Sequence, residues 1–267
     1  MPDPLGLLVE AKDVNIAYGN TLTVQNVSFS LKRGEVLTIV GESGSGKTSV
    51  IRALLGVLSG NGRVTQGQLL FKGQDLLAKN LRDWQRLRGK EISMIFQDSG
   101  NMLNPVRTIG SQYIEYIRMH SEADTEKARN MALDMLRRMN LPNPETIMAS
   151  YTFELSGGMR QRVGIAMAIT CRPSLLLADE PTSALDVTTQ AQIVKELLRV
   201  VKKYGAGMIM VTHNIGVAAY MSDKLMVMSG GKVLEYGAAE ELIQNPKADY
   251  TKELLAAVPE IGGKRYA

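Results

Sequence analysis

The sequence is poor in cysteine and has no long apolar run. Cys171 is the single cysteine among 267 residues, which excludes an intramolecular disulfide and a metal site of four cysteines. No apolar run approaches the roughly 20 residues that span a bilayer. The start, MPDPLGLLVE, has neither the basic segment nor the long apolar core of a signal peptide. We therefore expect any membrane role to come through partner proteins.

The chain also has little excess charge of either sign. It carries 31 Lys and Arg against 27 Asp and Glu, a net charge of +4, with 45% hydrophobic and 22% charged residues. These are ordinary values for a folded chain and exclude disordered or collagen-like classes. A pI near 9.1 suggests nucleic acid as a partner. However, an excess of four charges over this length is a weak field, which favours a mixed-charge surface.

The hydrophobic pattern differs between the first third of the chain and the part after Ser156. The first third alternates as antiparallel strands do, over residues 7–18, 23–34, 35–41 and 62–73, and residues 47–58 form an amphipathic helix. Residues 108–150 are helical and polar, and the prolines of LPNPET break this helical stretch. From Ser156 onward apolar strands alternate with helices, which predicts a parallel sheet covered on both faces. The pattern indicates an α/β fold.

A glycine-rich loop carries the first chemical signal. GESGSGKT, from Gly41 to Thr48, lies between an apolar strand and a helix, the context that identifies a phosphate-binding loop. Lys47 would reach the β- and γ-phosphates, Thr48 would coordinate Mg²⁺, and the backbone N–H groups would face the phosphates. The predicted nucleotide-binding residues here are Gly41, Ser43, Gly44, Ser45, Gly46, Lys47, Thr48 and Ser49. The loop by itself does not separate ATPases from kinases or GTPases.

Two carboxylates follow a second apolar strand. In SLLLADE, residues 174–180, Asp179 is placed to hold Mg²⁺ and Glu180 to polarise an attacking water. A positioned base contributes about 10²–10⁴ in rate. Two acids after a strand are often only a solvated strand end, but the phosphate loop upstream favours the catalytic interpretation.

The segment LSGGMRQ, residues 155–161, places Ser156, Gly157 and Gly158 at the start of a helix. A hydroxyl and unshielded amides there offer an anion site, although alone they would suggest a helix cap. The spacing from Ser156 to Asp179 is that of the ATP-binding cassette family, which this chain resembles from end to end.

The resemblance assigns further residues. Tyr18 stands where the family stacks an aromatic ring on adenine, Gln97 where a glutamine contacts Mg²⁺ and water, and His213 where a histidine senses the γ-phosphate. The loop at residues 183–186, ending in Asp186, matches the loop that crosses the dimer interface. The other histidine, His120, lies in a polar stretch and is expected at the surface.

The resemblance also implies an architecture. We expect one ABC nucleotide-binding domain over residues 1–267, with a RecA-like P-loop core and an antiparallel β-subdomain from about 1–97 and 170–267. An inserted α-helical subdomain with the signature motif is expected at about 98–169. In the family, the signature of one protomer covers the nucleotide of the other, so two ATP molecules are held in a head-to-tail dimer.

The length of the chain and of its internal segments excludes several branches of the family. The interval from Thr48 to Ser156 is too short for the long coiled coil of chromosome-maintenance relatives, and the chain has room for one cassette and no fused membrane domain. QDSGNMLNPVRTIGSQ and the tail NPKADYTKELLAAVP resemble bacterial oligopeptide, dipeptide and nickel importers. The resemblance implies two polytopic membrane permease subunits, a second ATPase subunit (a sister chain or a second copy) and an extracytoplasmic solute-binding protein. It places the chain peripherally on the cytoplasmic face of the bacterial inner membrane.

Two departures and one alternative remain. Many members of this group continue into a cysteine-bearing extension that holds an iron–sulfur cluster; this chain ends soon after Val258 and Cys171 lies elsewhere, so no cluster is predicted. Asn214 follows His213 where Asp is common, which should tune the site. The alternative is a mechanochemical ATPase that acts on nucleic acid or ribosomes without a transporter. Only the pI favours it, and we expect no nucleic-acid partner.

Overall fold

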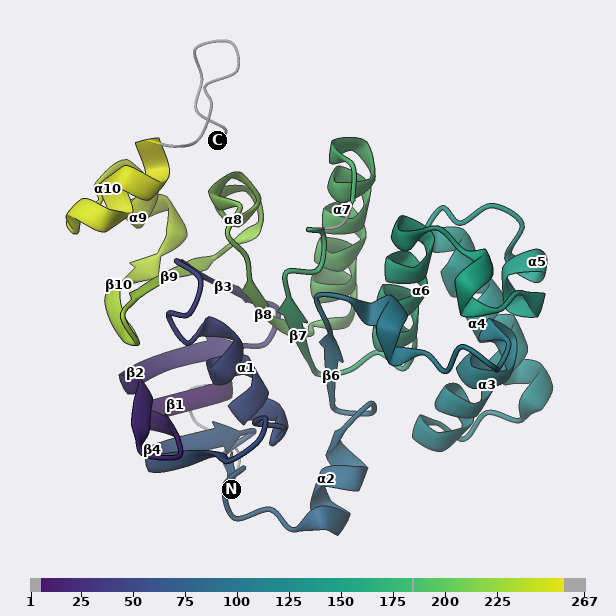
Figure 1. Ribbon diagram of the computed structural model, residues 1–267, viewed down its shortest axis with the longest axis horizontal. Coiled ribbons are helices and arrows are strands. Elements are labelled where there is room, and N and C mark those ends of the chain that lie inside the picture. The colour runs from purple at the N-terminus through teal and green to yellow at the C-terminus, as the bar shows by residue number, and fades with distance from the viewer. Residues whose placement is uncertain (1–5, 184, 257–267) are drawn as a thin grey trace.

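Two β-sheets and a group of helices build the fold (Figure 1), which a computed structural model describes for residues 6–183 and 185–256. The antiparallel sheet, in spatial order, contains β2 (Thr21–Lys32), β1 (Leu7–Tyr18), β4 (Gly62–Phe71) and β5 (Gln74–Asp75). The second sheet, in spatial order, contains β10 (Lys232–Ala238), β9 (Lys224–Ser229), β3 (Val36–Gly41), β8 (Gly207–Val211), β7 (Leu175–Asp179) and β6 (Ile92–Ile95).

The α-helices differ widely in length. They are α1 (Lys47–Leu55), α2 (Leu81–Leu87), α3 (Ile109–His120), α4 (Thr125–Arg138), α5 (Pro144–Ala149), α6 (Gly157–Thr170), α7 (Val187–Tyr204), α8 (Ile215–Met221), α9 (Ala239–Gln244) and α10 (Asp249–Ala256). Two 3₁₀ turns, η1 (Ser99–Met102) and η2 (Thr152–Glu154), lie before α3 and before α6.

The second sheet confirms the predicted parallel arrangement. Its strands from β9 through β3, β8 and β7 to β6 pair in parallel, and β10 joins β9 as an antiparallel edge. One expectation was wrong: residues 35–41 were grouped with the antiparallel strands, whereas β3 lies at the centre of the parallel sheet. All six residues of β3 are buried, because other elements cover this sheet on both faces.

Alternation along the parallel strands divides the core into two layers. Leu175, Leu177 and Ile209 pack with α1 and the antiparallel sheet in one apolar cluster. Their neighbours Leu176 and Met208 point to the other face and pack with α6 and α7. Successive strand residues face opposite sides of a sheet, so this sheet lies between a β-layer and a helical layer, as Figure 1 shows.

The helices α3–α6 group on one side of the molecule, far from the antiparallel sheet (Figure 1). They lie within the segment predicted as the helical insertion, between β6 and β7 in the chain. As expected, the helical stretch is interrupted around LPNPET, between the end of α4 and the start of α5. Pro144 opens α5 at its first turn, where its missing N–H costs nothing. Helix α1 ends at Leu55, three residues before the expected Leu58, and Gly56 in the left-handed conformation caps it.

No helix was expected from the sequence where the short helices α2, α9 and α10 lie. Within residues 6–183 and 185–256, no helix is both long and apolar enough to cross a bilayer. Ala184 of the predicted interface loop, the first five residues and the tail after Ala256 lie outside the described residues.

Candidate nucleotide-binding site

Four parallel strands bring the predicted site residues to one edge of the sheet. The phosphate loop follows β3, Gln97 follows β6, Glu180 follows β7 and His213 follows β8. The carboxyl ends of parallel strands meet at a common edge, which is where open α/β sheets bind ligands. The residues therefore converge although the chain separates them widely.

Glycine lets the phosphate loop take a backbone path closed to other residues. Gly44 and Gly46 have φ values of 81° and 93°, in the left-handed region that L side chains rarely adopt. At Gly46 a Cβ atom would lie only 2.6 Å from Cγ2 of Val24. The backbone thus curls closely against β2 before α1 begins.

The Lys47 ammonium group lies inside this loop. Its Nζ donates hydrogen bonds to the carbonyl oxygens of Gly41 (2.8 Å) and Glu42 (2.6 Å), and only 7% of the residue is exposed. Burial lowers the pKa of Lys47, while the nearby carboxylates of Glu180, Asp179 and Glu42 oppose that shift. The loop therefore holds a positive charge at its centre, suited to a phosphate.

The N-terminus of α1 completes the anion-binding end of the loop. In α2, α3, α4, α6, α7 and α8 an N-cap side chain accepts a backbone hydrogen bond, whereas Gly46 gives α1 no side-chain cap. The first-turn N–H groups of α1 are thereby available to phosphate oxygens, which the helix dipole favours.

A cavity of about 400 Å³ opens over this helix end. Its lining residues are Thr23, Gly41, Ser43, Gly44, Gly46, Lys47, Thr48, Ser49, Gln97, Glu180, Val211 and His213. It therefore combines the loop with the side chains from the ends of β6, β7 and β8.

Thr48 and Asp179 form the pair that fits Mg²⁺. The Thr48 hydroxyl donates to Oδ1 of Asp179 over 3.0 Å, which places two hard oxygen donors together, as Mg²⁺ prefers. Burial raises the pKa of Asp179, and the hydrogen bond from Thr48 opposes this shift. A divalent cation here would favour the ionised carboxylate.

Glu180 lies where the chain leaves β7, in a strained conformation. Its φ is 44°, which costs of order 1–3 kcal/mol for a residue other than glycine, and its N–H bonds to the Val211 carbonyl of β8 over 2.9 Å. The carboxylate accepts from Nε2 of Gln97 at 3.3 Å and lies 3.2 Å from Nδ1 of His213. Three strand ends therefore orient one carboxylate beside the loop.

Other predicted residues lie outside this cavity within the same chain. Ser156 caps α6 by accepting from the N–H of Met159, and Ser156 and Gly157 are exposed. Asp186 caps α7 by accepting from Thr189, and these hydrogen bonds lower its pKa. The signature is thus open to a partner instead of facing its own phosphate loop.

Two more predicted residues, Tyr18 and Ser45, support the loop. The Tyr18 hydroxyl is hydrogen-bonded to Ser49 over 3.1 Å, and its ring packs beside Gly62. The Ser45 hydroxyl donates to the Glu42 carbonyl over 2.9 Å and is 1% exposed. Tyr18 therefore adjoins the first turn of α1, and Ser45 shapes the loop from within.

Two residues that contribute to the cavity or to its phosphate loop were not predicted from the sequence. Thr23 of β2 lines the cavity, and Glu42 accepts from the Ser229 hydroxyl (2.8 Å) and the Gly230 N–H (3.1 Å). These hydrogen bonds lower the pKa of Glu42 and tie the loop to the β9–β10 turn. Glu42 is inside the motif, but at a position where the motif accepts any residue, so the pattern carried no signal for it.

His120 was expected at the surface, but it is only partly exposed. His120 is half-buried, packs edge-on against Tyr116 at 4.7 Å and lines an apolar groove of about 300 Å³. Burial lowers its pKa. Phe96 and Ser99, which flank the Gln97 segment, line the same groove, so the groove adjoins the nucleotide site.

The loop, the uncapped helix end and the converging carboxylates define a P-loop nucleotide-binding protein. A family model described as ABC transporter matches residues 24–183, and the chain belongs to that family of ATPases. It is 41% identical to the oligopeptide transport ATP-binding protein AmiE of Streptococcus pneumoniae, over 96% of this chain and 73% of AmiE. It is 42% identical to the oligopeptide transport ATP-binding protein OppD of Salmonella typhimurium, over 97% of this chain and 78% of OppD.

Other similarities extend this result. The glutathione import ATP-binding protein GsiA of Escherichia coli is 42% identical over 97% of this chain, which spans 43% of GsiA. The solved dimer of the cassette MJ0796 bound to ADP and Pi superposes with a TM-score of 0.78 at 26% identity, over 86% of this chain and 98% of that one. The fold class is thereby confirmed as the ABC ATPase fold.

Proposed function

We propose that the chain binds MgATP in the cavity above α1. The phosphates bind to the Lys47 ammonium and to the first-turn N–H groups of α1. Mg²⁺ is held by the Thr48 hydroxyl and the Asp179 carboxylate, and Gln97 also contacts the ion. When bound, the ion neutralises charge on the phosphate oxygens. Tyr18, beside Ser49, is at the end of the loop where the adenine ring would stack.

Hydrolysis uses the Glu180 carboxylate as general base. It accepts a proton from a water whose oxygen attacks the γ-phosphorus, the bond to the β–γ bridging oxygen breaks, and ADP and phosphate leave. Gln97 and His213 hold the carboxylate in place, so positioning supplies much of the catalysis, as in phosphoryl transfer generally. The convergence of these side chains on the phosphate loop is the observation that carries the proposal.

Two cassettes act together in a head-to-tail dimer. The exposed Ser156 and Gly157 and the amide of Gly158 cover the ATP of the other protomer, and Asp186 lies beside the interface. The solved MJ0796 structures are dimeric, which supports this arrangement. The chain divides into a core with a β-subdomain, residues 1–97 and 170–267, and a helical subdomain at about 98–169.

The dimer drives a solute importer. Two polytopic permease subunits, a second ATPase subunit (the same chain or a sister) and an extracytoplasmic binding protein complete it. The chain itself lies peripherally on the cytoplasmic face of the bacterial inner membrane. The names of AmiE, OppD and GsiA support peptides, glutathione among them, as cargo, and nickel comes from the sequence resemblance alone. An apolar groove lies beside the Gln97 segment. Its position supports a route by which closure of the ATPase dimer is transmitted to a permease subunit.

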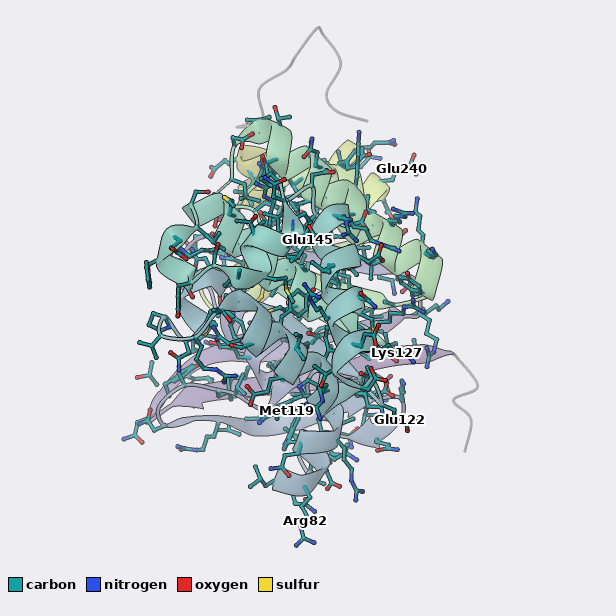
Figure 2. All side chains as sticks on the ribbon, turned by 90° about the vertical axis from the view of Figure 1, so that its right-hand side faces the viewer. Arg82, Met119, Glu122, Lys127, Glu145 and Glu240 are labelled. Atoms are coloured by element: carbon teal, nitrogen blue, oxygen red, sulfur yellow. The ribbon has the colours of Figure 1, made fainter. Side chains whose placement is uncertain are left out.

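The alternative, a mechanochemical ATPase on nucleic acid or ribosomes, has less support. Figure 2 shows nitrogen- and oxygen-bearing side chains interspersed over the helical face, where Lys127 lies on the same side as Glu122 and Glu145. Phosphate-backbone binding needs a clustered positive charge. None of the similar proteins named above is such an ATPase.

The experiment is to titrate the full chain and Lys47→Ala with MgATP, by nucleotide fluorescence. Wild type should bind and hydrolyse ATP, whereas Lys47→Ala should bind at least about tenfold more weakly, because a charge-assisted phosphate contact is lost. Lys127→Ala, on the exposed face of the helical group, is the matched control and should bind as wild type. Equal affinity of Lys47→Ala and wild type would contradict the proposed site.

A further inference from the structure

The side-chain amide of Gln161, on α6, connects two separate backbone segments. Its Nε2 donates to the carbonyl of Pro181 (2.9 Å) and to that of Phe96 (3.2 Å), and its Oε1 accepts from the N–H of Ser99 (3.0 Å). The residue is only 3% exposed. A buried amide with both donor hydrogens and its oxygen engaged is held in one orientation.

The two segments are those that carry the proposed catalytic side chains. Phe96 directly precedes Gln97, and Pro181 directly follows Glu180. Those two side chains meet in the Gln97–Glu180 hydrogen bond of 3.3 Å. Gln161 thus holds the backbone on both sides of that contact.

Close packing brings α6 to the segment after Gln97. At Gly164, one turn beyond Gln161, a Cβ atom would lie 2.1 Å from Cβ of Ser99. At Gly100 it would lie 2.6 Å from Cβ of Arg160. Only glycine at these two positions allows η1 to lie directly on α6, within reach of the Gln161 amide.

The same helix begins with the signature. Gln161 is five residues after Ser156, so it lies about 7–8 Å along the axis of α6 from this N-cap residue. If the signature contacts the ATP held by the other protomer, α6 can move. The Gln161 side chain would then transmit this movement to both catalytic segments.

We propose that Gln161 is a positioning residue for ATP hydrolysis, which sets the Gln97 and Glu180 segments relative to each other and to the signature helix. This inference rests on the proposed function, because it assumes that Glu180 is the base. Gln161 lines neither the nucleotide cavity nor the phosphate loop. Its loss should therefore act on catalysis and spare binding.

The test compares Gln161→Met with wild type in the full chain. Methionine keeps the length of the side chain but removes the amide, so Ser99 N–H and the Pro181 carbonyl lose these hydrogen bonds. A misplacement of about 1 Å costs on the order of a hundredfold in rate. We expect kcat to fall at least about tenfold, while KM for MgATP stays within about threefold of wild type.

Thr170→Val is the matched control on the same helix. The Thr170 hydroxyl is also buried and hydrogen-bonded, to the Ala166 carbonyl and to Tyr113, but it touches neither catalytic segment. Thr170→Val should lose stability with kcat within about twofold of wild type, the folded fraction of each variant being measured by circular dichroism at the assay temperature.

Gln161→Glu adds a second measurement, the pH dependence of kcat, which would not change if Gln161 had a purely structural role. An ionised carboxylate accepts from Ser99 N–H but cannot donate to the Pro181 carbonyl, whereas the protonated form can. The kcat of Gln161→Glu relative to wild type should therefore rise as pH falls from about 8 to about 6, while Gln161→Met shows no such rise.

The outcomes separate the two proposals. A folded Gln161→Met with the kcat of wild type, or a loss of kcat no larger than in Thr170→Val, would overturn the positioning role and leave the proposed function intact. A flat relative pH profile of Gln161→Glu would also count against it. Full activity in Glu180→Gln would instead overturn the catalytic assignment on which the inference rests.

Discussion

The Glu180 carboxylate lies 3.2 Å from Nδ1 of His213, although the two residues follow different strands. Parallel pairing of β7 with β8 places Asp179 opposite Val211, and the chain then continues by one residue to Glu180 and by two to His213. The contact between the two side chains is therefore a consequence of strand register. His213 is 67% exposed at its side chain and Glu180 only 21%, so the histidine is the more solvent-accessible member of this contact.

Glu180→Gln should bind MgATP as wild type does but hydrolyse it at least about 10²-fold more slowly, because the amide cannot accept the proton from water. Single-turnover hydrolysis measures the chemical step, and nucleotide fluorescence measures binding. Asp249→Asn removes an exposed carboxylate on α10 that pairs with Lys252 of the same helix; it is a matched control and should hydrolyse ATP normally. An unchanged single-turnover rate in Glu180→Gln would reject the assignment.

Two inactive variants should complement each other if each ATP lies between two protomers. In Lys47→Ala the phosphate loop fails. In Gly157→Asp a carboxylate stands at the exposed start of α6, where it would repel the γ-phosphate of the partner's nucleotide. In a mixed dimer one composite site carries both lesions and the other carries neither, so mixing should restore ATPase activity above either variant alone.

The complementation needs its own control and has a clear failure. A mixture of Lys47→Ala with the double variant Lys47→Ala/Gly157→Asp leaves no intact composite site and should stay inactive. If the second subunit is a sister chain, the two lesions are divided between the two different chains. No recovery in either format, with folding and dimerisation verified, would contradict the head-to-tail arrangement.

His120 should make the protein sensitive to acid. Burial lowers its pKa below the ordinary 6.5, so the folded state favours the neutral imidazole, and Tyr116 and Arg88 are the titratable groups that share its groove. A folded pKa below the unfolded one contributes stability that is present above about pH 6.5 and is lost as pH falls through the folded pKa.

The measurement for His120 is Tm at about pH 7.5 and pH 5.5, on either side of the ordinary histidine pKa. Wild type should lose more of its Tm over this interval than His120→Gln, which has no group titrating there. An identical loss of Tm in both proteins would show that His120 does not link folding to pH.

Contiguous motifs could be predicted from the sequence because their chemistry depends on local geometry. GESGSGKT between a strand and a helix defines the phosphate loop, since its glycines and its lysine act within a few residues of one another. The family and the α/β class followed from such motifs and their spacing. Asp179 and Glu180 could be predicted for the same reason, because they are consecutive residues at the end of one strand.

What only the tertiary structure decided involves distant segments. The central place of β3, the partial burial of His120 and the meeting of Gln97 with Glu180 each depend on which elements pack together. Gln161 illustrates the reason: its three hydrogen bonds go to backbone atoms, which every residue type offers. Sequence patterns record side chains and their spacing, whereas the strand order and close helix packing that bring those backbone atoms within reach exist only in the folded chain.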